Sequence, residues 1–271
     1  MRAIGESSAG FVLHSYPYRE TSLILEAFTR SHGRIVFVAK GAKRPTSAMK
    51  SVLNPFQQLS FKWFGQADMK TLKSAEHERI FPQLSGATLM SAFYMNELLL
   101  KLTHREEAHE VLFQSYENAV MQLSGAAEGF EEVINGAAPL SVSRKMDVRN
   151  IAAVLRRFEI SLLQEIGYAL SLNEEAETHE AIELSREYFY VFERGPVACD
   201  RMLRRSANRH GNGTIDGLQL QGKTLRDMAA GDFSDPVTQM QSKQLMRRAI
   251  NHVLGDKTLH TRQLIRDLQV N

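Results

Sequence analysis

Short runs in which apolar and polar residues alternate occupy the first 82 positions of the chain, and this period of two predicts β-strands. The alternation is clearest where Leu59, Phe61 and Trp63 share one face of a predicted strand. Turn residues separate the runs, and Pro17 stands in the first predicted turn. Five short strands favour a small barrel, of which the OB-fold is the five-stranded form. The predicted strands are Phe11–Tyr16, Thr21–Thr29, Ile35–Ala39, Gln58–Phe64 and Met69–Ala75.

The spacing changes after Pro82, because apolar residues then recur every three or four positions and predict helices. Thr103 and Glu106 fit a capping box at the start of the second helix. Asp235 followed by Pro236 predicts the start of the last long helix. The second part of the chain is therefore predicted to be mainly helical.

These patterns predict an α+β protein with two domains. An OB-fold barrel over residues 1–82 is expected to pack on a helical domain over residues 83–271. Residues 173–222 are expected to form an irregular insertion in that domain, where Tyr188–Phe192 predicts a strand of a small β-hairpin region.

Composition excludes several classes of protein. The 271 residues are 43% hydrophobic and 24% charged, as in an ordinary globular chain. The single cysteine, Cys199, excludes an internal disulfide framework and a multi-cysteine zinc site. Because the amino terminus lacks a signal-peptide pattern and no apolar run approaches roughly 18–20 residues, we expect a cytoplasmic protein without a membrane segment. Nucleotide-binding, hydrolase and metalloprotease motifs are absent, so no catalytic residue or cofactor is predicted.

Charge is separated along the chain, although the net charge is only +2. Twelve Lys/Arg against six Asp/Glu give residues 1–82 a charge of +6, and seven against sixteen give residues 83–185 a charge of −9. Fourteen against nine give residues 186–271 a charge of +5. Basic ends around an acidic middle direct a polyanion to particular surfaces, which favours a nucleic-acid-binding protein.

The basic turn that follows the third predicted strand is the main candidate for this contact. A hairpin around Gly33 leads into it, and Gly41 lets a backbone come close to an anionic ligand. Such a turn is also an ordinary surface loop in many small barrels. Phe64 shares a strand face with Lys62 and is the best exposed aromatic for stacking on a base. The predicted DNA contacts are Arg34, Lys40, Lys43, Arg44, Lys62, Phe64, Arg204 and Arg205.

The predicted helix over residues 149–168 carries a second candidate site. Arg156, Ile160 and Leu163 lie at i, i+4 and i+7 and form one stripe. A cation beside aliphatic side chains suits a short acidic and apolar peptide. An arginine whose stem packs along the helix while its charge reaches water would give the same pattern.

Several stretches of the chain, in the order of a known family, resemble the RecO family of bacterial recombination mediators. The resemblance is carried by FVLHSYPYRETSLILEAFTRSHGRIVFVAKGAKR near the amino terminus, LRRFEISLLQEIGY in the middle and MRRAINHVLGDKTLHTRQL near the end. It implies an amino-terminal OB-fold packed on a helical domain, binding to single- and double-stranded DNA, and annealing of complementary strands. It implies no enzymatic chemistry and a place at the nucleoid.

The same resemblance implies protein partners. RecO proteins act with RecR and dock on the acidic, phenylalanine-ended tail of the single-stranded-DNA-binding protein, so that RecA can be loaded. The pocket for that ring and its carboxylate is predicted on the helix over residues 149–168, with Arg156 as the preferred anchor. The predicted tail contacts are Arg156, Arg157, Ile160, Leu163 and Ile166.

In one respect the sequence departs from the family, many of whose members carry a four-cysteine zinc site after the LLxxxGY motif. Only Cys199 stands in the corresponding region, so no zinc is expected and the hairpin near Tyr188 is predicted to pack by apolar contact alone. Two other functions remain open. One is a general OB-fold nucleic-acid binder without a mediator role, and the other is an enzyme whose site assembles from scattered residues.

Overall fold

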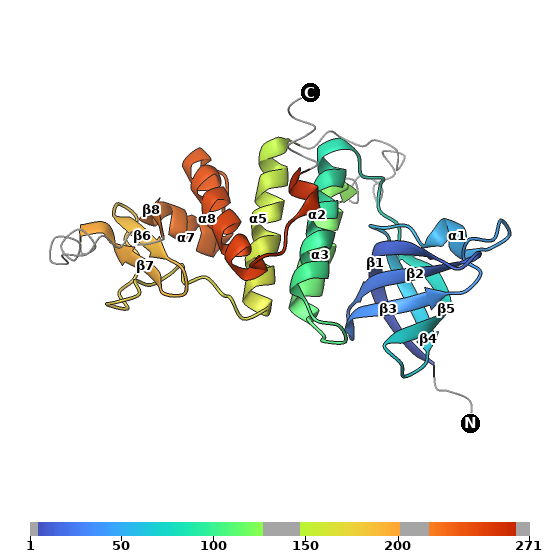
Figure 1. Ribbon diagram of the computed structural model, residues 1–271. Helices are drawn as coiled ribbons and strands as arrows, with labels where there is room; N and C mark the ends of the chain where they lie inside the picture. The colour runs from blue at the N-terminus through green and yellow to red at the C-terminus, as the bar shows by residue number, and fades with distance from the viewer. Residues whose placement is uncertain (1–4, 127–146, 201–216, 264–271) are drawn as a thin grey trace. The chain divides into compact units, whose positions relative to one another are not determined.

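The computed structural model describes residues 5–126, 147–200 and 217–263 (Figure 1). The chain divides into two compact units, which are described separately. The first unit comprises residues 1–147 and 257–271, and the second comprises residues 148–256. The sequence-based boundary at residue 82 follows the end of the barrel, whereas the first unit continues because two helices pack against the barrel.

Five strands of the first unit form a closed barrel, as the sequence predicts, and their order around it is β1-β2-β3-β5-β4 (Figure 1). Strands β3 and β5 pair in parallel, and every other pair is antiparallel. The short helix α1 lies between β3 and β4 along the chain. The elements are β1 Glu6–Tyr18, β2 Ser22–Thr29, β3 Gly33–Ala39, α1 Met49–Val52, β4 Gln58–Phe64 and β5 Met69–Arg79.

Strand β1 is longer than predicted, and Pro17 belongs to it rather than to the turn. Pro17 pairs with Leu23 of β2, and the turn begins only at Arg19. Proline is accepted here because β1 pairs with β4 only from Glu6 to Gly10, so its later part has a strand on one side among the described residues.

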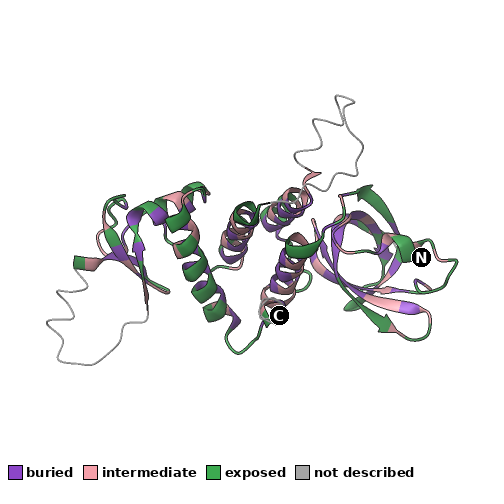
Figure 2. Ribbon diagram, turned by 90° about the horizontal axis from the view of Figure 1, so that it is seen from above, coloured by how far each residue is buried: buried purple, intermediate pink, exposed green. Residues whose placement is uncertain are grey.

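Alternate side chains of the strands fill the barrel, as expected for a period of two. Phe37, Phe61 and Trp63 are fully buried in this core, whereas Phe64 is 41% exposed. Figure 2 shows buried residues along the strands of the barrel. The prediction that Leu59, Phe61 and Trp63 share one face of a strand is confirmed, because all three are buried in the barrel core.

Helices α2 (Gly86–Leu102) and α3 (Glu110–Leu123) cover part of the outside of the barrel. Phe11 lies 5.7 Å from Phe113 and 5.1 Å from Tyr116 between ring centroids. The Tyr116 hydroxyl donates to Asn96 Oδ1 over 2.6 Å, and Asn96 Nδ2 donates to the Leu13 carbonyl over 2.9 Å. This buried chain of hydrogen bonds joins both helices to β1.

The capping box predicted at Thr103 is wrong. Helix α3 begins at Glu110, and the Thr103 hydroxyl donates to Leu99 O at the end of α2. Glu106 instead binds the barrel, because its N–H donates to Arg34 O over 2.8 Å and its carboxylate lies 2.8 Å from Lys70 Nζ. The loop between the helices is therefore fixed by contacts that are distant in sequence.

A segment near the carboxyl end returns to α2 in the first unit. The Glu97 carboxylate accepts hydrogen bonds from His260 N, Thr261 N and the Thr261 hydroxyl at 2.6–2.9 Å. Burial alone would raise the pKa of Glu97, but these hydrogen bonds outweigh it and lower the pKa below its ordinary value.

The second unit contains a three-stranded antiparallel sheet in the order β7-β6-β8 and three helices in its described part. Asp235 caps α8 by accepting from Val237 N and Thr238 N, as predicted. None of the described helices has the length and hydropathy that crossing a membrane requires. The elements are α5 Val148–Glu165, β6 Glu187–Val191, β7 Gly195–Ala198, β8 Gly217–Gln221, α7 Gly222–Ala230 and α8 Pro236–Leu254.

The hairpin of β6 and β7 does not pack by apolar contact alone. Glu175 is 2% exposed, and its carboxylate accepts from Ala198 N over 3.1 Å and from the Thr178 hydroxyl over 2.6 Å. A buried carboxylate thus ties the preceding loop to β7. Within the described ranges, no group of three or more His, Cys, Asp or Glu side chains is placed to hold a metal ion.

Candidate nucleic-acid interface

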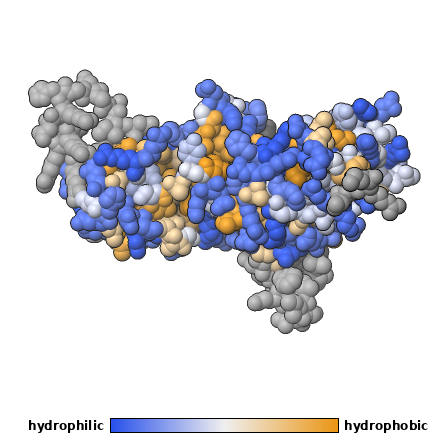
Figure 3. Space-filling model, turned by 90° about the horizontal axis from the view of Figure 1, so that it is seen from below, coloured by the Kyte–Doolittle hydropathy of each residue, from blue (hydrophilic) through white to orange (hydrophobic). Residues whose placement is uncertain are grey.

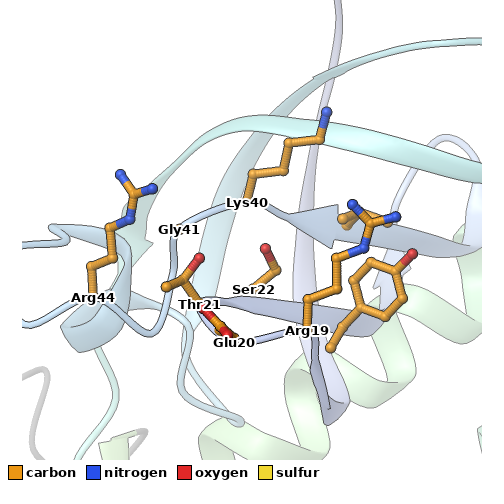
Figure 4. Close-up of a pocket in the computed structure, with 9 residues that line it drawn as sticks. Arg19, Glu20, Thr21, Ser22, Lys40, Gly41 and Arg44 are labelled. Atoms are coloured by element: carbon orange, nitrogen blue, oxygen red, sulfur yellow. The ribbon is translucent and has the colours of Figure 1, made fainter.

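Two turns of the barrel enclose a surface hollow with a volume of about 400 Å³. One turn joins β1 to β2, and the other follows β3. They are tied together by a hydrogen bond of 2.9 Å from Lys43 N to Thr21 O. We call this feature the basic hollow, because Arg19, Lys40 and Arg44 line it (Figure 4).

The sequence after β3 explains why the second turn has this form. Gly41 has a φ of +72°, a left-handed conformation that side chains disfavour. The next residue, Ala42, turns its methyl group into the barrel core and is 1% exposed. Arg44 N then closes the turn by donating to Gly41 O over 3.1 Å. The buried alanine anchors the turn, while the cations on either side of it stay at the surface.

The cations of the two turns are available to a ligand. Arg19, Lys40, Lys43 and Arg44 are all exposed, and none of them forms an ion pair with another described residue. In Figure 4 the side chains of Arg19, Lys40 and Arg44 extend to the same side of the turns. Glu20 is the one carboxylate in the lining, so the hollow carries excess positive charge. Such an arrangement attracts phosphate groups.

Arg19 was not among the predicted contacts. The negative charge of the next residue, Glu20, cancels that of Arg19 when charges are summed along the sequence. The turn was also predicted at Pro17, before Arg19. The structure gives Arg19 a φ of +52° and sets its guanidinium carbon 5.2 Å from the centroid of the Tyr18 ring. In the sequence, Arg19 could have been identified only as a cation that follows Tyr18 near the predicted turn.

Other predicted DNA contacts lie apart from the hollow or outside the described residues. Lys62 and Phe64 are exposed on β4, and Lys62 Nζ lies 3.8 Å from Glu76 Oε1. Arg204 and Arg205 fall in residues 201–216, outside the described residues.

Arg34 is a correction to the predicted set. Its side chain is only 12% exposed, and its guanidinium donates to Leu100 O over 2.9 Å and to Thr103 O over 3.1 Å. It also lies 3.6 Å from Glu26, and burial lowers its pKa from the ordinary value. Arg34 therefore holds the end of α2 against the barrel, and its guanidinium does not face solvent as a phosphate contact would.

Four of the predicted tail contacts lie on α5, and Ile166 directly follows its last residue, Glu165. The five residues differ in exposure. The Arg156 guanidinium donates to Glu159 over 2.7 Å, and the two side chains are 11% and 1% exposed. Leu163 is 1% exposed, whereas Ile160 and Ile166 are half-buried. The surface cation is Arg157, which donates to Gly231 O over 3.0 Å and lies 5.8 Å from the centroid of the Phe233 ring. Arg156 thus lacks the open guanidinium that an anchor needs.

The chain is similar to curated DNA repair proteins over nearly its full length. Residues 1–81 match the family described as Recombination protein O N terminal. The DNA repair protein RecO of Nitrosospira multiformis is 43% identical over 97% of this chain and 96% of its own length. Those of Aromatoleum aromaticum and Azoarcus sp. are 41% and 40% identical, each over 97% of this chain and 96% of the relative.

Proposed function

Since this chain belongs to the RecO family of DNA repair proteins, we propose that it works in repair as a recombination mediator that binds DNA and catalyses no reaction. It would bind single- and double-stranded DNA, anneal complementary strands, and act with RecR to load RecA. The observation that carries DNA binding is the basic hollow, in which exposed cations from two turns gather beside one another.

Phosphate contacts would come from Lys40, Lys43 and Arg44 of the second turn and from Arg19 of the first. Each cation that neutralises a phosphate releases counterions, so affinity should fall as salt rises. The log–log slope is about −0.7 per contact on single strands and about −0.9 per contact on duplex. Because phosphates carry no sequence information, this surface would bind DNA of any sequence.

The test is the charge reversal of two cations in the hollow. The double variant Lys40→Glu, Arg44→Glu should weaken binding to single strands and duplex alike, and should make the single-strand salt slope shallower by about 1.4. The double variant Lys243→Glu, Arg247→Glu is the matched control, because it changes the net charge equally on exposed residues of α8. Equal losses in the two variants, or no loss in the first, would remove the hollow as the DNA site.

Annealing separates the mediator from a general OB-fold nucleic-acid binder. The chain should speed the pairing of complementary strands that are covered by the single-stranded-DNA-binding protein, and the Lys40→Glu, Arg44→Glu variant should not. A chain that binds DNA but leaves the annealing rate unchanged would instead fit the general binder.

Docking of the acidic tail is proposed on the surface of α5 around Arg157 and Ile160, extending toward Ile166, which directly follows the helix. Arg157 is the exposed cation of this helix segment, and its guanidinium carbon lies over the Phe233 ring, 5.8 Å from the ring centroid. An exposed arginine pairing with a carboxylate contributes up to about 1 kcal/mol. Replacing Arg157 by Ala should therefore weaken a labelled tail peptide up to about fivefold, whereas Lys243→Ala in the same unit should not. An unchanged affinity for Arg157→Ala would move the tail site away from α5.

A further inference from the structure

The lining of the basic hollow contains a serine that is almost fully buried. Ser22, the first residue of β2, lines the hollow and is only 8% exposed. Its hydroxyl has no hydrogen-bond partner among the described residues. Buried polar groups in folded proteins are nearly always hydrogen-bonded, so an exception calls for an explanation. A ligand in the hollow that accepts a hydrogen bond from Ser22 would provide one.

The hydroxyls and the cations of the hollow are directed to the same side of the two turns. Figure 4 shows the hydroxyls of Thr21 and Ser22 pointing toward the side to which Arg19, Lys40 and Arg44 extend. Thr21 is half-buried, and its hydroxyl also makes no hydrogen bond with a described residue. Because the three cations are exposed whereas Ser22 is buried, we call Thr21 and Ser22 the floor of the hollow and the cations its rim. A ligand on the floor would be surrounded by positive charge.

The composition of the lining indicates an anionic ligand. Apolar surface residues lie in patches on the face of the molecule in Figure 3, whereas the lining of the hollow has one aliphatic residue, Val38. The three rim cations and the single carboxylate, Glu20, leave a charge of +2 in the lining. A phosphate monoester carries about −1.5 to −2 charges near neutral pH and has three acceptor oxygens. A phosphodiester within a strand carries a single charge and offers one oxygen fewer, so the monoester matches the hollow better.

Access to the floor also favours the end of a strand. A phosphate within a strand has a sugar on both sides, and both sugars would have to enter the hollow before that phosphate could reach the hydroxyl of Ser22. A terminal phosphate has the chain on one side only, so it can enter first. The volume of about 400 Å³ lies within the range of roughly 300–1,000 Å³ for ligand sites. The hollow therefore has room for a terminal phosphate and part of the sugar that carries it.

We propose that the basic hollow binds the terminal phosphate of a DNA strand, with the Ser22 hydroxyl donating to a phosphate oxygen and the rim cations surrounding the charge. The inference rests on the proposed function, because it takes DNA as the ligand of the hollow. It adds a preference for one part of the DNA, the strand end that carries a phosphate monoester at its 5′ or 3′ side. Phosphates within a strand bind the exposed rim more weakly, so the chain collects at interruptions of a strand.

The first experiment compares strands of oligo-dT, about 16 nucleotides long, that differ only at their ends. A phosphate at the 5′ or the 3′ end should tighten binding roughly 10- to 150-fold over the strand with hydroxyl ends, the range for one charge-assisted hydrogen bond. A 5′ phosphate capped as its methyl ester is a diester, and that strand should bind like the hydroxyl-ended one. No gain from either phosphate, or an equal gain from the methyl ester, would overturn the proposal. Displacement of the phosphorylated strand by an equal concentration of inorganic phosphate would assign the hollow to the free ion and would also overturn it.

The second experiment changes the floor of the hollow and measures the ratio of the affinities for the phosphorylated and the hydroxyl-ended strand. Ser22→Ala should lower this ratio by at least about fivefold, because it removes the buried donor. Ser22→Thr keeps a hydroxyl and should keep the ratio. Ser60→Ala is the matched control, because Ser60 is a half-buried serine of the barrel outside the lining. An unchanged ratio in Ser22→Ala, or an equal fall in Ser60→Ala, would overturn the role of Ser22 and with it the proposal.

The charge reversal of the rim separates this proposal from the function on which it rests. If Lys40→Glu, Arg44→Glu weakens binding to both strands while a terminal phosphate gives the original chain no advantage, the strand-end site is overturned and the proposed function stands. If the charge reversal has no effect on either strand, the proposed function itself fails.

Discussion

Replacing Tyr116 by phenylalanine removes one hydroxyl from the interface of α2, α3 and β1, and we expect the first unit to lose stability. The hydroxyl is fully buried and donates to Asn96 Oδ1 over 2.6 Å. Asn96 Nδ2 in turn donates to Leu13 O, so one amide links both helices to the barrel. Burial raises the pKa of Tyr116 far above its ordinary value, so the hydroxyl remains a donor at working pH.

The expected loss of stability follows from the groups that Tyr116→Phe keeps and the hydrogen bond that it removes. The ring and its packing against Phe11 persist, while a buried amide oxygen loses this donor, which costs about 1–3 kcal/mol. For a unit of this size, 1 kcal/mol shifts Tm by roughly 2–4 °C, so a fall of roughly 2–12 °C is expected. Trp63 is the single tryptophan of the chain and lies in the barrel core, so its fluorescence follows the unfolding of this unit.

Tyr168→Phe is the control, because Tyr168 is 49% exposed and its change should stay within about 0.5 kcal/mol. A second check combines Tyr116→Phe with Asn96→Ala, since residues in one network should couple by at least about 0.5 kcal/mol. The reasoning would be refuted if the Tm of Tyr116→Phe lay within 1 °C of the original and the slope of denaturant unfolding were unchanged. It would also be refuted if the stability losses of Tyr116→Phe and Asn96→Ala were strictly additive in the double variant.

Three further predictions concern other parts of the fold. Gly33→Ala should cost at least about 2 kcal/mol of stability, because Gly33 has a φ of +63° and the new Cβ would lie 1.7 Å from Glu107 O. Gly125→Ala should cost less, because Gly125 has a φ of +73° but lies in open space. Equal losses of stability for the two variants in thermal denaturation would contradict this prediction. Because the pKa of Glu97 is lowered on folding, its stabilisation is present above its ordinary pKa of 4.5 and is lost as pH falls through the lowered value. Amides of residues 257–263 should therefore lose protection against hydrogen exchange in acid, measured relative to the intrinsic exchange rate at each pH, and Glu97→Gln should show that lower protection already at pH 7. Elemental analysis after dialysis should find no stoichiometric zinc, and one zinc per chain would overturn the interpretation of the region around Cys199.

The barrel was predictable from sequence because each strand depends on neighbours two residues apart. Leu59, Phe61 and Trp63 face inward simply because a strand alternates, and no distant contact is needed to know it. The same local logic placed Phe64 at the surface. The inward-facing residues of such strands follow from the spacing of apolar residues along the chain, and that spacing can be read from one sequence.

The errors have a different physical origin, because they concern contacts between segments distant in sequence. Arg34 and Lys40 are both cations on one short stretch, yet Arg34 is held by carbonyls 66 and 69 residues away. Thr103 and Glu106 fit a capping box by spacing alone, but the bond from Glu106 N to Arg34 O keeps the loop out of a helix. Arg156 shows the same limit, since helical spacing gives its stripe but not its exposure.

The position of Pro17 in β1 has a consequence for how these molecules behave in a crowded solution. Beyond Gly10, β1 has no second partner strand among the described residues, and an unpaired edge offers its N–H and C=O groups to the strand of any other chain. Pro17 has no N–H, so a ladder that started there would lack a donor. The proline that obscured the turn in the sequence thus protects this barrel from edge-to-edge aggregation.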